Sequence, residues 1–420
     1  MALSPFASRS PSMTVASPNS ALRLKAAASH HVPGQAAAAK PESKPERELT
    51  EQLNDDVRRK YIKGALEATA PQGTIEFSLR LTDRIGKKLG EGTYAIVYLG
   101  HFRDDPSSCV AIKKIKVNAE YKDGLTMDAI REVKYLQELS HRNVIALHDV
   151  FSSKDQNLNL VLEFLPGGDL EMLIKDGDIH YGVGDVKAWM GMLARGVWFC
   201  HENFVLHRDI KPNNLLIAAD GEVKLADFGL ARSFADPYLN MTHQVITRWY
   251  RPPELLFGAK QYSGAVDVWS MGMVFAELLL RVPLLAGMSD LDQISKICEA
   301  FGTPTEENWP GVTQLANYVA DKAVPVQGRD FFLRQFPTAG PVGADLLMSM
   351  CVLDPRKRAT ALQVLQHKWW TTEPRPTKNE DLPRKSGTKK MGDDLARRGG
   401  ETDDGPFKNA ARQLDFGAMK

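Results

Sequence analysis

The sequence predicts an α+β fold in which a smaller, mainly β part precedes a larger, mainly helical part. Residues 85–100 hold β-forming residues around small ones, and residues 160–165 form an apolar strand that ends at Pro-Gly-Gly. Residues 267–366, in contrast, contain helical patterns separated by glycine and proline. At 420 residues, the chain has room for one large two-lobed domain with tails, or for two or three ordinary domains.

The composition is typical of a globular protein that can bury a core, with 43% hydrophobic and 25% charged residues. A net charge of +1 gives no reason to expect direct binding to nucleic acid or to an acidic membrane. The four cysteines are scattered and form no C-x-x-C pair, which favours a reduced compartment over a disulfide or zinc framework. The most apolar stretch, 274–285, contains Glu277 and Arg281, so we expect a core helix rather than a membrane span.

The two ends of the chain differ in composition from its middle. Residues 1–48 are rich in Ala, Ser and Pro and have no acidic residue before Glu42. This pattern fits a disordered tail, which we favour, or an organelle transit peptide. Apolar residues at helical spacing predict a short helix and linker within residues 49–80. Residues 371–420 are polar with basic clusters, which favours a solvated tail and, as a second interpretation, a nuclear import signal.

The most informative stretch runs from His207 to Gly229 and contains a predicted hairpin. Asp220-Gly221 is a strong two-residue turn signal between two strand-like arms of equal length. Such a turn would set Asn214 opposite Asp227, with Cβ atoms roughly 4.5–5.5 Å apart. An amide oxygen and a carboxylate at this spacing, with Asp209 just upstream, suit Mg²⁺ completed by substrate phosphates.

A second group of residues, in the predicted β part, suits phosphate binding. Glycines within residues 90–97 let backbone N–H groups approach phosphate oxygens. Lys113 ends an apolar strand, where an unpaired ammonium would be costly, and Glu132 on a predicted helix is the available partner. The apolar face expected for that helix comprises Ile130, Val133, Leu136 and Leu139.

The runs His-Arg-Asp-Ile-Lys-Pro-Asn-Asn and Asp-Phe-Gly in this stretch resemble the catalytic and metal-binding loops of eukaryotic protein kinases. The resemblance covers residues 81–370 and implies a kinase N-lobe at 81–162, followed by the hinge and C-lobe at 163–370. It implies that Asp209 accepts the proton of the substrate hydroxyl and that Asn214 and Asp227 hold magnesium. Lys211 marks the Ser/Thr-directed kind. The implied cofactors are ATP and Mg²⁺, with Lys113 and Glu132 positioning the α- and β-phosphates.

The same resemblance assigns the nucleotide site. Leu162 is the implied gatekeeper, and the backbones of Glu163 and Leu165 are expected to bond adenine. Ala95 stands where the family has a third loop glycine, and we still assign this loop to the nucleotide. The full set implied is Leu89, Gly90, Glu91, Gly92, Thr93, Tyr94, Ala95, Ile96, Val97, Ala111, Lys113, Leu162, Glu163, Leu165 and Leu216.

Between Asp227 and Glu254 lies a long segment without periodicity, which predicts a functional loop. By resemblance, Thr242 is its regulatory phosphorylation site. Arg131, Arg208 and Arg232 are expected to surround a phosphate there. Val245 and Ile246 match the pocket that favours proline after the target residue, Thr247 matches the threonine that contacts the catalytic Asp and Lys, and Glu254 is expected to pair with Arg358.

Residues 126–132 resemble the cyclin-docking helix of cyclin-dependent kinases, and several C-lobe segments resemble the CDK-activating branch associated with TFIIH. This resemblance implies a cyclin H-like partner, a RING-type assembly factor and a nuclear location. It also implies two substrates: activation loops of other cyclin-dependent kinases and the C-terminal repeats of RNA polymerase II. Two alternatives remain: a non-catalytic pseudokinase or scaffold subunit, and a cell-cycle or MAP-type kinase.

Overall fold

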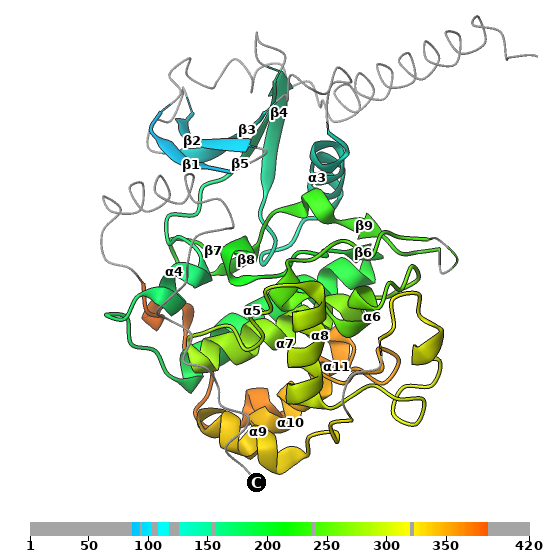
Figure 1. The fold of residues 1–420 in the computed structure, drawn as a ribbon. Coiled ribbons are helices and arrows are strands. Elements are labelled where there is room, and N and C mark those ends of the chain that lie inside the picture. The colour runs from blue at the N-terminus through cyan, green and yellow to red at the C-terminus, as the bar shows by residue number, and fades with distance from the viewer. Residues whose placement is uncertain are drawn as a thin grey trace, which may run out of the picture. The chain divides into compact units, whose positions relative to one another are not determined.

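The structure is a computed structural model, and it describes residues 86–92, 95–102, 108–116, 126–152, 157–236, 238, 240–319 and 323–384. The predicted segments 1–48 and 49–80 lie outside these residues, as does the chain beyond residue 384. In the described part, a five-stranded sheet with one helix comes first and a mainly helical region follows (Figure 1). This is the α+β arrangement of two lobes that the sequence predicts.

Every neighbouring pair of strands in the sheet is antiparallel, in the order β1-β2-β3-β5-β4. The bounds are β1 Lys88–Glu91, β2 Ala95–His101, β3 Cys109–Ile115, β4 Leu147–Ser152 and β5 Leu158–Glu163. Lys113 on β3 lies between Val97 of β2 and Leu160 of β5, so its strand is central in the sheet. Gly100 on β2 leaves room for the Ile112 side chain, whose terminal methyl would lie 2.6 Å from a Cβ at this position and would have to shift.

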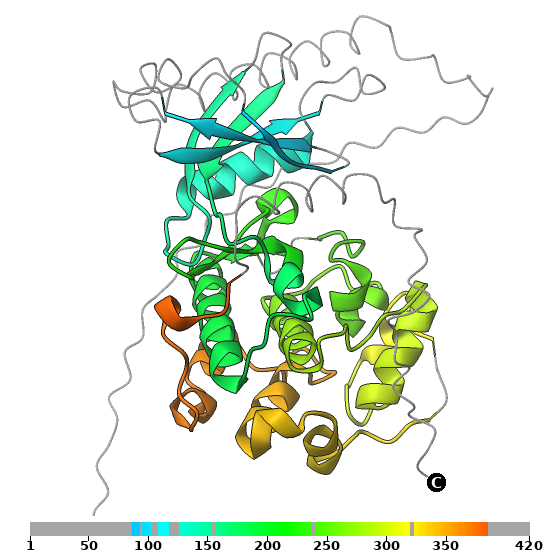
Figure 2. The same cartoon turned by 90° about the vertical axis from the view of Figure 1, so that its left-hand side faces the viewer.

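Helix α3 (Met127–Glu138) accompanies this sheet (Figure 2) and begins after Thr126, whose hydroxyl accepts a hydrogen bond from the Ala129 N–H at 3.3 Å. The predicted apolar face is only half right. Leu136 and Leu139 are buried, but Ala129, Glu132 and Tyr135 complete the inner face, while Ile130 and Val133 stay partly exposed. The reason is that α3 packs against residues 228–230 of the second lobe, and this contact buries the side of the helix that carries Glu132.

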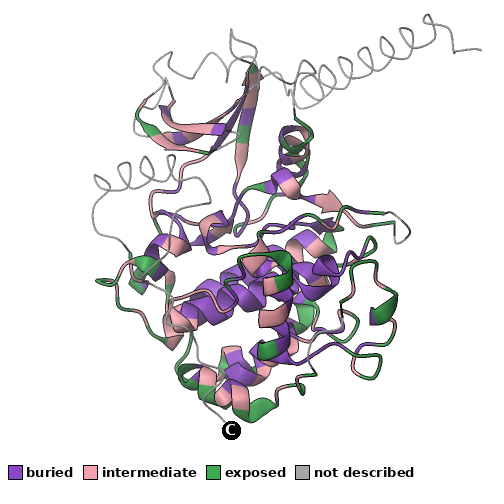
Figure 3. Cartoon of the chain, in the orientation of Figure 1, coloured by how far each residue is buried: buried purple, intermediate pink, exposed green. Residues whose placement is uncertain are grey.

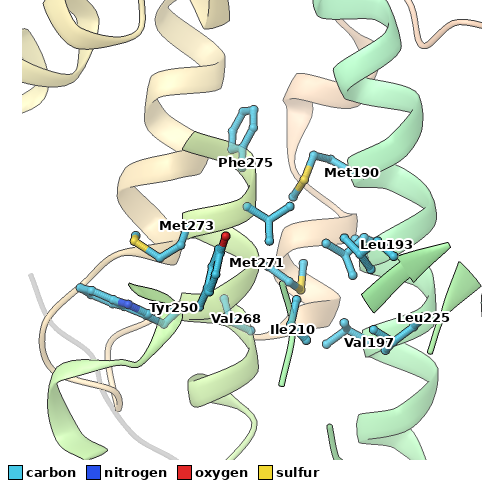
Figure 4. Close-up of a cluster of buried hydrophobic side chains, with 14 of the residues drawn as sticks. Met190, Leu193, Val197, Ile210, Leu225, Tyr250, Val268, Met271, Met273 and Phe275 are labelled. Atoms are coloured by element: carbon cyan, nitrogen blue, oxygen red, sulfur yellow. The ribbon is translucent and has the colours of Figure 1, made fainter. Parts of the chain in front are cut away.

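The core of the second lobe lies between α5 (Val183–Glu202) and α7 (Ala265–Leu280), which are mostly buried along their length (Figure 3). Figure 4 shows apolar side chains of both helices meeting Ile210 and Leu225, which come from the predicted catalytic stretch. The expected core helix 274–285 stops early, because Arg281 adopts a left-handed φ of 61° and ends α7. None of the described helices combines the length and apolar character that a membrane span requires.

The remaining elements of the second lobe are short. Its strands are β6 Val205–Leu206, β7 Leu215–Ile217, β8 Val223–Leu225 and β9 Arg232–Ser233. Its other α-helices are α4 Leu170–Lys175, α6 Pro253–Leu256, α8 Asp290–Phe301, α9 Arg329–Gln335, α10 Gly340–Met350 and α11 Ala361–Leu365. The 3-10 helices are η1 Pro212–Asn214, η2 Phe228–Leu230, η3 Arg248–Tyr250, η4 Val312–Gln314, η5 Pro337–Ala339, η6 Lys368–Thr371 and η7 Asn379–Asp381.

Residues 372–384, which we call the C-terminal strap, have mostly exposed side chains, and the strap also makes specific contacts with the second lobe. The ammonium of buried Lys187 on α5 donates to three oxygens of the strap, on Thr372 and Pro374, at 2.8–2.9 Å. Further along, Arg384 donates to the carbonyl of Ala219 in the β7–β8 loop at 2.5 Å, and Leu382 is only 4% exposed. The strap therefore packs along the second lobe from α5 to the β7–β8 hairpin.

Candidate active site

Four of the predicted site residues form one closed hydrogen-bond network around Asp209. Its Oδ1 accepts from the Thr247 hydroxyl at 2.9 Å, and its Oδ2 lies 2.9 Å from both the Lys211 ammonium and the Asn214 amide nitrogen. Lys211 also donates to the Thr247 hydroxyl at 3.0 Å. Asp209 is buried, yet each carboxylate oxygen has a partner, so the side chain is held in one orientation.

The backbone of this loop is fixed by Asp267 in the first turn of α7, a residue that the sequence analysis did not single out. Its carboxylate accepts from the backbone N–H groups of His207 and Arg208, both at 2.9 Å, and pairs with His201 at 2.9 Å. Arg208 has a φ of 64°, an uncommon value for a non-glycine residue, which these bonds stabilise. Burial opposes ionisation of Asp267, but hydrogen bonds from His201 and Arg208 keep its pKa below the usual value.

His207 connects the two halves of the predicted hairpin stretch. Its Nδ1 accepts from the Asp209 N–H at 3.2 Å, so its Nε2–H donates to the Ala226 carbonyl at 3.0 Å. Phe228 meets the imidazole edge-on, with ring centroids 4.8 Å apart. Burial lowers the pKa of His207, which keeps the ring neutral and this pattern of one donor and one acceptor intact.

The register predicted for the β7–β8 hairpin is wrong by one residue. Leu215 pairs with Leu225 and Ile217 with Val223, so the residue opposite Asn214 is Ala226 and not Asp227. The Ala226 N–H donates to the Asn214 carbonyl at 2.9 Å. The cause is a three-residue loop: the Ala218 N–H donates to the Glu222 carbonyl at 2.8 Å and Gly221 has a φ of 88°.

Asp227 still turns toward the site, because its own backbone is left-handed with φ 65° and ψ 76°. Its Oδ1 lies 3.2 Å from the Lys113 ammonium, which is also 2.8 Å from each carboxylate oxygen of Glu132. The Lys113 charge holds the pKa of Asp227 below its usual range. Burial opposes the charged form of Lys113, but the two carboxylates raise its pKa above its usual value. The predicted Lys113–Glu132 pair is therefore formed, and Asp227 completes it.

The predicted nucleotide residues lie on the sheet, at its link to the second lobe and on β7. In the β1–β2 hairpin, the Gly92 N–H donates to the Ala95 carbonyl at 2.9 Å, and Thr93 and Tyr94 lie outside the described residues. Ala95 is buried in the main hydrophobic cluster, which accounts for a methyl group in place of glycine. The other loop positions, Leu89, Gly90, Glu91, Ile96 and Val97, are partly exposed.

The link between the lobes contains Leu162, Glu163 and Leu165. Leu162 is buried opposite Ala111 in the β3–β5 register. The Glu163 N–H already donates to the Ala146 carbonyl at 2.9 Å, so a ligand could use only the Glu163 carbonyl oxygen. After this link, the Gly167 N–H donates to the Ile217 carbonyl and the Ile217 N–H to the Gly168 carbonyl, which joins the link to β7 beside Leu216.

The structure brings two of the three predicted phosphate-binding arginines to the segment around Thr242. Arg208 reaches it through the hydroxyl of Tyr262, and Arg232 contacts the Asn240 carbonyl at 3.5 Å. Arg131 instead donates to Asp128 of its own helix at 2.8 Å. Thr242 itself is exposed.

Further along this segment, Val245 and Ile246 are buried, and Ile246 has a φ of 68°. The Ile246 carbonyl accepts from Nε and Nη2 of Arg251 at 3.1 and 3.0 Å. Beyond it, the expected pair of Glu254 with Arg358 is present and buried, at 2.7 and 2.9 Å. Arg251 therefore holds the backbone at Val245 and Ile246, and Arg358 holds the Glu254 side chain.

Asp267, Tyr262 and the C-terminal strap are the parts of this arrangement that sequence reasoning missed. For Asp267 a signal existed, because an acidic residue at the start of an almost wholly apolar helix is expensive to bury unless it is paired. For Tyr262 and the strap we find no comparable local signal.

Comparisons with known proteins agree with this geometry. The family model described as "Protein kinase domain" matches residues 84–370. Serine/threonine-protein kinase KIN28 of Saccharomyces cerevisiae is 52% identical over 291 residues, which cover 69% of this chain and 94% of the relative. Cyclin-dependent kinase 7 of Xenopus laevis is 48% identical over 298 residues, which cover 70% of this chain and 83% of the relative.

A solved structure supports the same family assignment. The CAK complex from Chaetomium thermophilum bound to ATP-gamma-S contains a chain with a TM-score of 0.72 and 63% identity, covering 75% of this chain and 98% of that one. The chain belongs to the protein kinase family, as a Ser/Thr kinase of the cyclin-dependent type in the CDK-activating branch.

Proposed function

We propose that this kinase transfers the γ-phosphoryl group of ATP with Asp209 as the residue that orients and deprotonates the target hydroxyl. The observation that carries the assignment is the closed network of Asp209, Lys211, Asn214 and Thr247, which leaves the buried carboxylate one orientation. The hydroxyl oxygen attacks the γ-phosphorus, the bond to the β-phosphate oxygen breaks, ADP leaves and Asp209 takes the proton. Lys211 lies on the same carboxylate and neutralises charge on the transferring group.

The residues present fit a magnesium ion. Asn214 donates through its amide nitrogen to Asp209, which leaves its oxygen for a cation, and Asp227 adds a carboxylate about half exposed. These are the hard oxygen ligands that Mg²⁺ prefers, and the ion would neutralise charge on the β- and γ-phosphates. No cluster of three or more His, Cys, Asp or Glu able to hold a metal occurs among the described residues, so nucleotide oxygens would complete the set.

Lys113 would hold the α- and β-phosphates. Its ammonium contacts Asp227 and is also held by the Glu132 carboxylate of α3 at 2.8 Å. A phosphate oxygen could replace Asp227 as a partner of the Lys113 ammonium, while the Lys113–Glu132 pair persists. The ammonium therefore stays charged and in place before the nucleotide arrives.

The backbone just before Thr247 supports a preference for proline after the target residue. The Ile246 carbonyl turns away to Arg251, because the left-handed backbone redirects it. A substrate N–H at this position would find no acceptor, which disfavours every residue except proline, the one residue without that N–H.

For partners, we propose a cyclin of the cyclin H type and a RING-type assembly factor. The outer face of α3 supports the cyclin, since Met127 is 58% exposed and Ile130 stays partly exposed on a helix that positions Glu132. The solved relative is part of a complex whose name is CAK. By the same likeness, we propose a nuclear location and two substrates, namely activation loops of other cyclin-dependent kinases and the C-terminal repeats of RNA polymerase II.

The test is Asp209→Asn in the complex with its cyclin, measured by transfer of labelled phosphate from ATP to a Ser-Pro peptide. We expect turnover to fall roughly 10²–10⁴-fold while nucleotide binding persists, because the amide cannot accept the proton. Asp330→Asn, on exposed α9, is the matched control and should keep full turnover. Near-normal turnover of the Asp209 variant would refute the assignment.

A further inference from the structure

The hydroxyl of Tyr262 joins the activation segment to the catalytic loop. It accepts a hydrogen bond from Arg208 Nη1 at 2.8 Å and donates one to the Thr242 carbonyl at 2.7 Å. Tyr262 lies between α6 and α7, outside both segments that it connects. Burial raises the pKa of Tyr262, so the phenol keeps the proton that it donates.

The Arg208 side chain is fixed on its other edge as well. Its Nε donates to the Leu230 carbonyl at 2.7 Å, just after the Asp227-Phe228-Gly229 run, and its backbone N–H donates to Asp267. Arg208 is 1% exposed and directly precedes Asp209. Contacts that fix the Arg208 guanidinium therefore also restrict the backbone that leads into Asp209.

Both acceptors that the structure gives this guanidinium are neutral: a carbonyl and a phenol. A buried cation needs such partners when no anion is near it. The Thr242 carbonyl is held by the same phenol, and the neighbouring Met241 N–H donates to the Lys260 carbonyl at 2.7 Å. The segment around Thr242 is therefore already connected to Arg208 without any phosphate.

We propose that Tyr262 is a positioning residue that keeps the activation segment in its active arrangement when Thr242 carries no phosphate. This rests on the proposed kinase activity and on the role as regulatory phosphorylation site that the family resemblance implies for Thr242. A phosphate on Thr242 would bind Arg208 and Arg232 directly and make the phenol redundant. The kinase thus has two interchangeable connections between Thr242 and Arg208, one neutral and one charged.

The test compares Tyr262→Phe with the native residue, in the full chain with its cyclin, on two backgrounds: Thr242→Ala, and stoichiometric Thr242 phosphate verified by mass spectrometry. Phe keeps the ring and loses both hydrogen bonds. On Thr242→Ala we expect kcat to fall about tenfold, the order expected for two ordinary hydrogen bonds, with KM for ATP unchanged. On the phosphorylated form we expect a change of about twofold or less, because the phosphate supplies the connection.

The control is Tyr318→Phe, which removes a phenol bond to the Pro304 carbonyl at 3.0 Å far from Arg208 and should leave both forms unchanged. An equal loss on both backgrounds would mean a general structural role and would overturn the proposal, as would no loss on Thr242→Ala. Because the two connections are interchangeable, phosphate should change turnover little in the native Tyr262 protein and should restore it in Tyr262→Phe. Failure of phosphate to raise turnover in Tyr262→Phe would overturn the proposal, whereas loss of all phosphate transfer in the native protein would instead contradict the proposed kinase activity.

Discussion

Leu382 gives a direct measure of what the C-terminal strap contributes to stability. Its side chain is 4% exposed and belongs to the main hydrophobic cluster, although it lies twelve residues beyond the stretch that matches the kinase family. Truncation of a buried leucine to alanine removes its transfer free energy and leaves a cavity. Because the strap lies at the edge of the lobe and can partly relax, we expect Leu382→Ala to lower the free energy of unfolding by about 2–3 kcal/mol.

The assay is thermal unfolding of the full chain, in which this loss should lower Tm by about 2 °C per kcal/mol for a domain of this size. Leu362→Ala on α11 is the matched control, since Leu362 is 42% exposed and the same atoms are removed. That variant should change the free energy of unfolding by about 0.5 kcal/mol or less. Equal shifts for the two variants would show that burial of Leu382 in the strap has no energetic consequence.

Truncation extends the same reasoning to the whole strap. A chain that ends after Trp370 loses Leu382 together with all three oxygens that satisfy the Lys187 ammonium. A chain that ends after Arg384 keeps every one of these contacts. We therefore expect the chain that ends after Trp370 to lose at least as much free energy of unfolding as Leu382→Ala. The chain that ends after Arg384 should not show this loss.

Two further predictions concern buried acids of α7. Burial raises the pKa of Glu277 to about 7 despite a 2.6 Å bond from Tyr250, so its stabilising effect is complete below pH about 4.5 and is lost as pH rises to about 7. Glu277→Gln should therefore remove a decline of roughly 3 kcal/mol between pH 5 and 8 in denaturant unfolding, and parallel pH profiles would contradict this. Asp267→Asn should lower kcat about 10²-fold, because an amide cannot accept from both His207 and Arg208, and Tm together with nucleotide affinity would show whether positioning alone is affected.

The chemistry of the site could be predicted from the sequence because it depends on residue type and short spacing. Asp209, Lys211 and Asn214 lie within six residues, so one loop brings them together. The register expected for Asn214 and Asp227 was wrong, and their role as magnesium ligands stays a prediction. Asp-Gly suits a two-residue turn, but Gly221 takes the left-handed position of a three-residue loop, and the register slips by one. The left-handed backbone of Asp227 nevertheless turns its side chain toward Lys113.

What the sequence could not supply are contacts between segments that lie far apart. Asp267 reaches back about 60 residues to the catalytic loop, and Arg384 reaches back 165 residues to Ala219. Neither contact leaves a periodic pattern, because each uses a single side chain. Composition does not reveal the contacts of the strap, because they depend on backbone carbonyls that accept from Lys187, on the bond from Arg384 to the Ala219 carbonyl and on one buried leucine.

Residues 227–233 connect every input to this site. Asp227 meets Lys113 of the sheet, the Leu230 carbonyl meets Arg208 of the catalytic loop, and the Ser233 N–H donates to the Tyr135 hydroxyl of α3 at 2.7 Å. A partner that moves α3 must therefore move this segment, and so must a phosphate that draws on Arg208. Because both act on the same seven residues, their effects on turnover should be coupled and not additive. The Lys113–Glu132 pair therefore contacts this segment at Asp227, and the Tyr262 connection reaches it through Arg208 at Leu230.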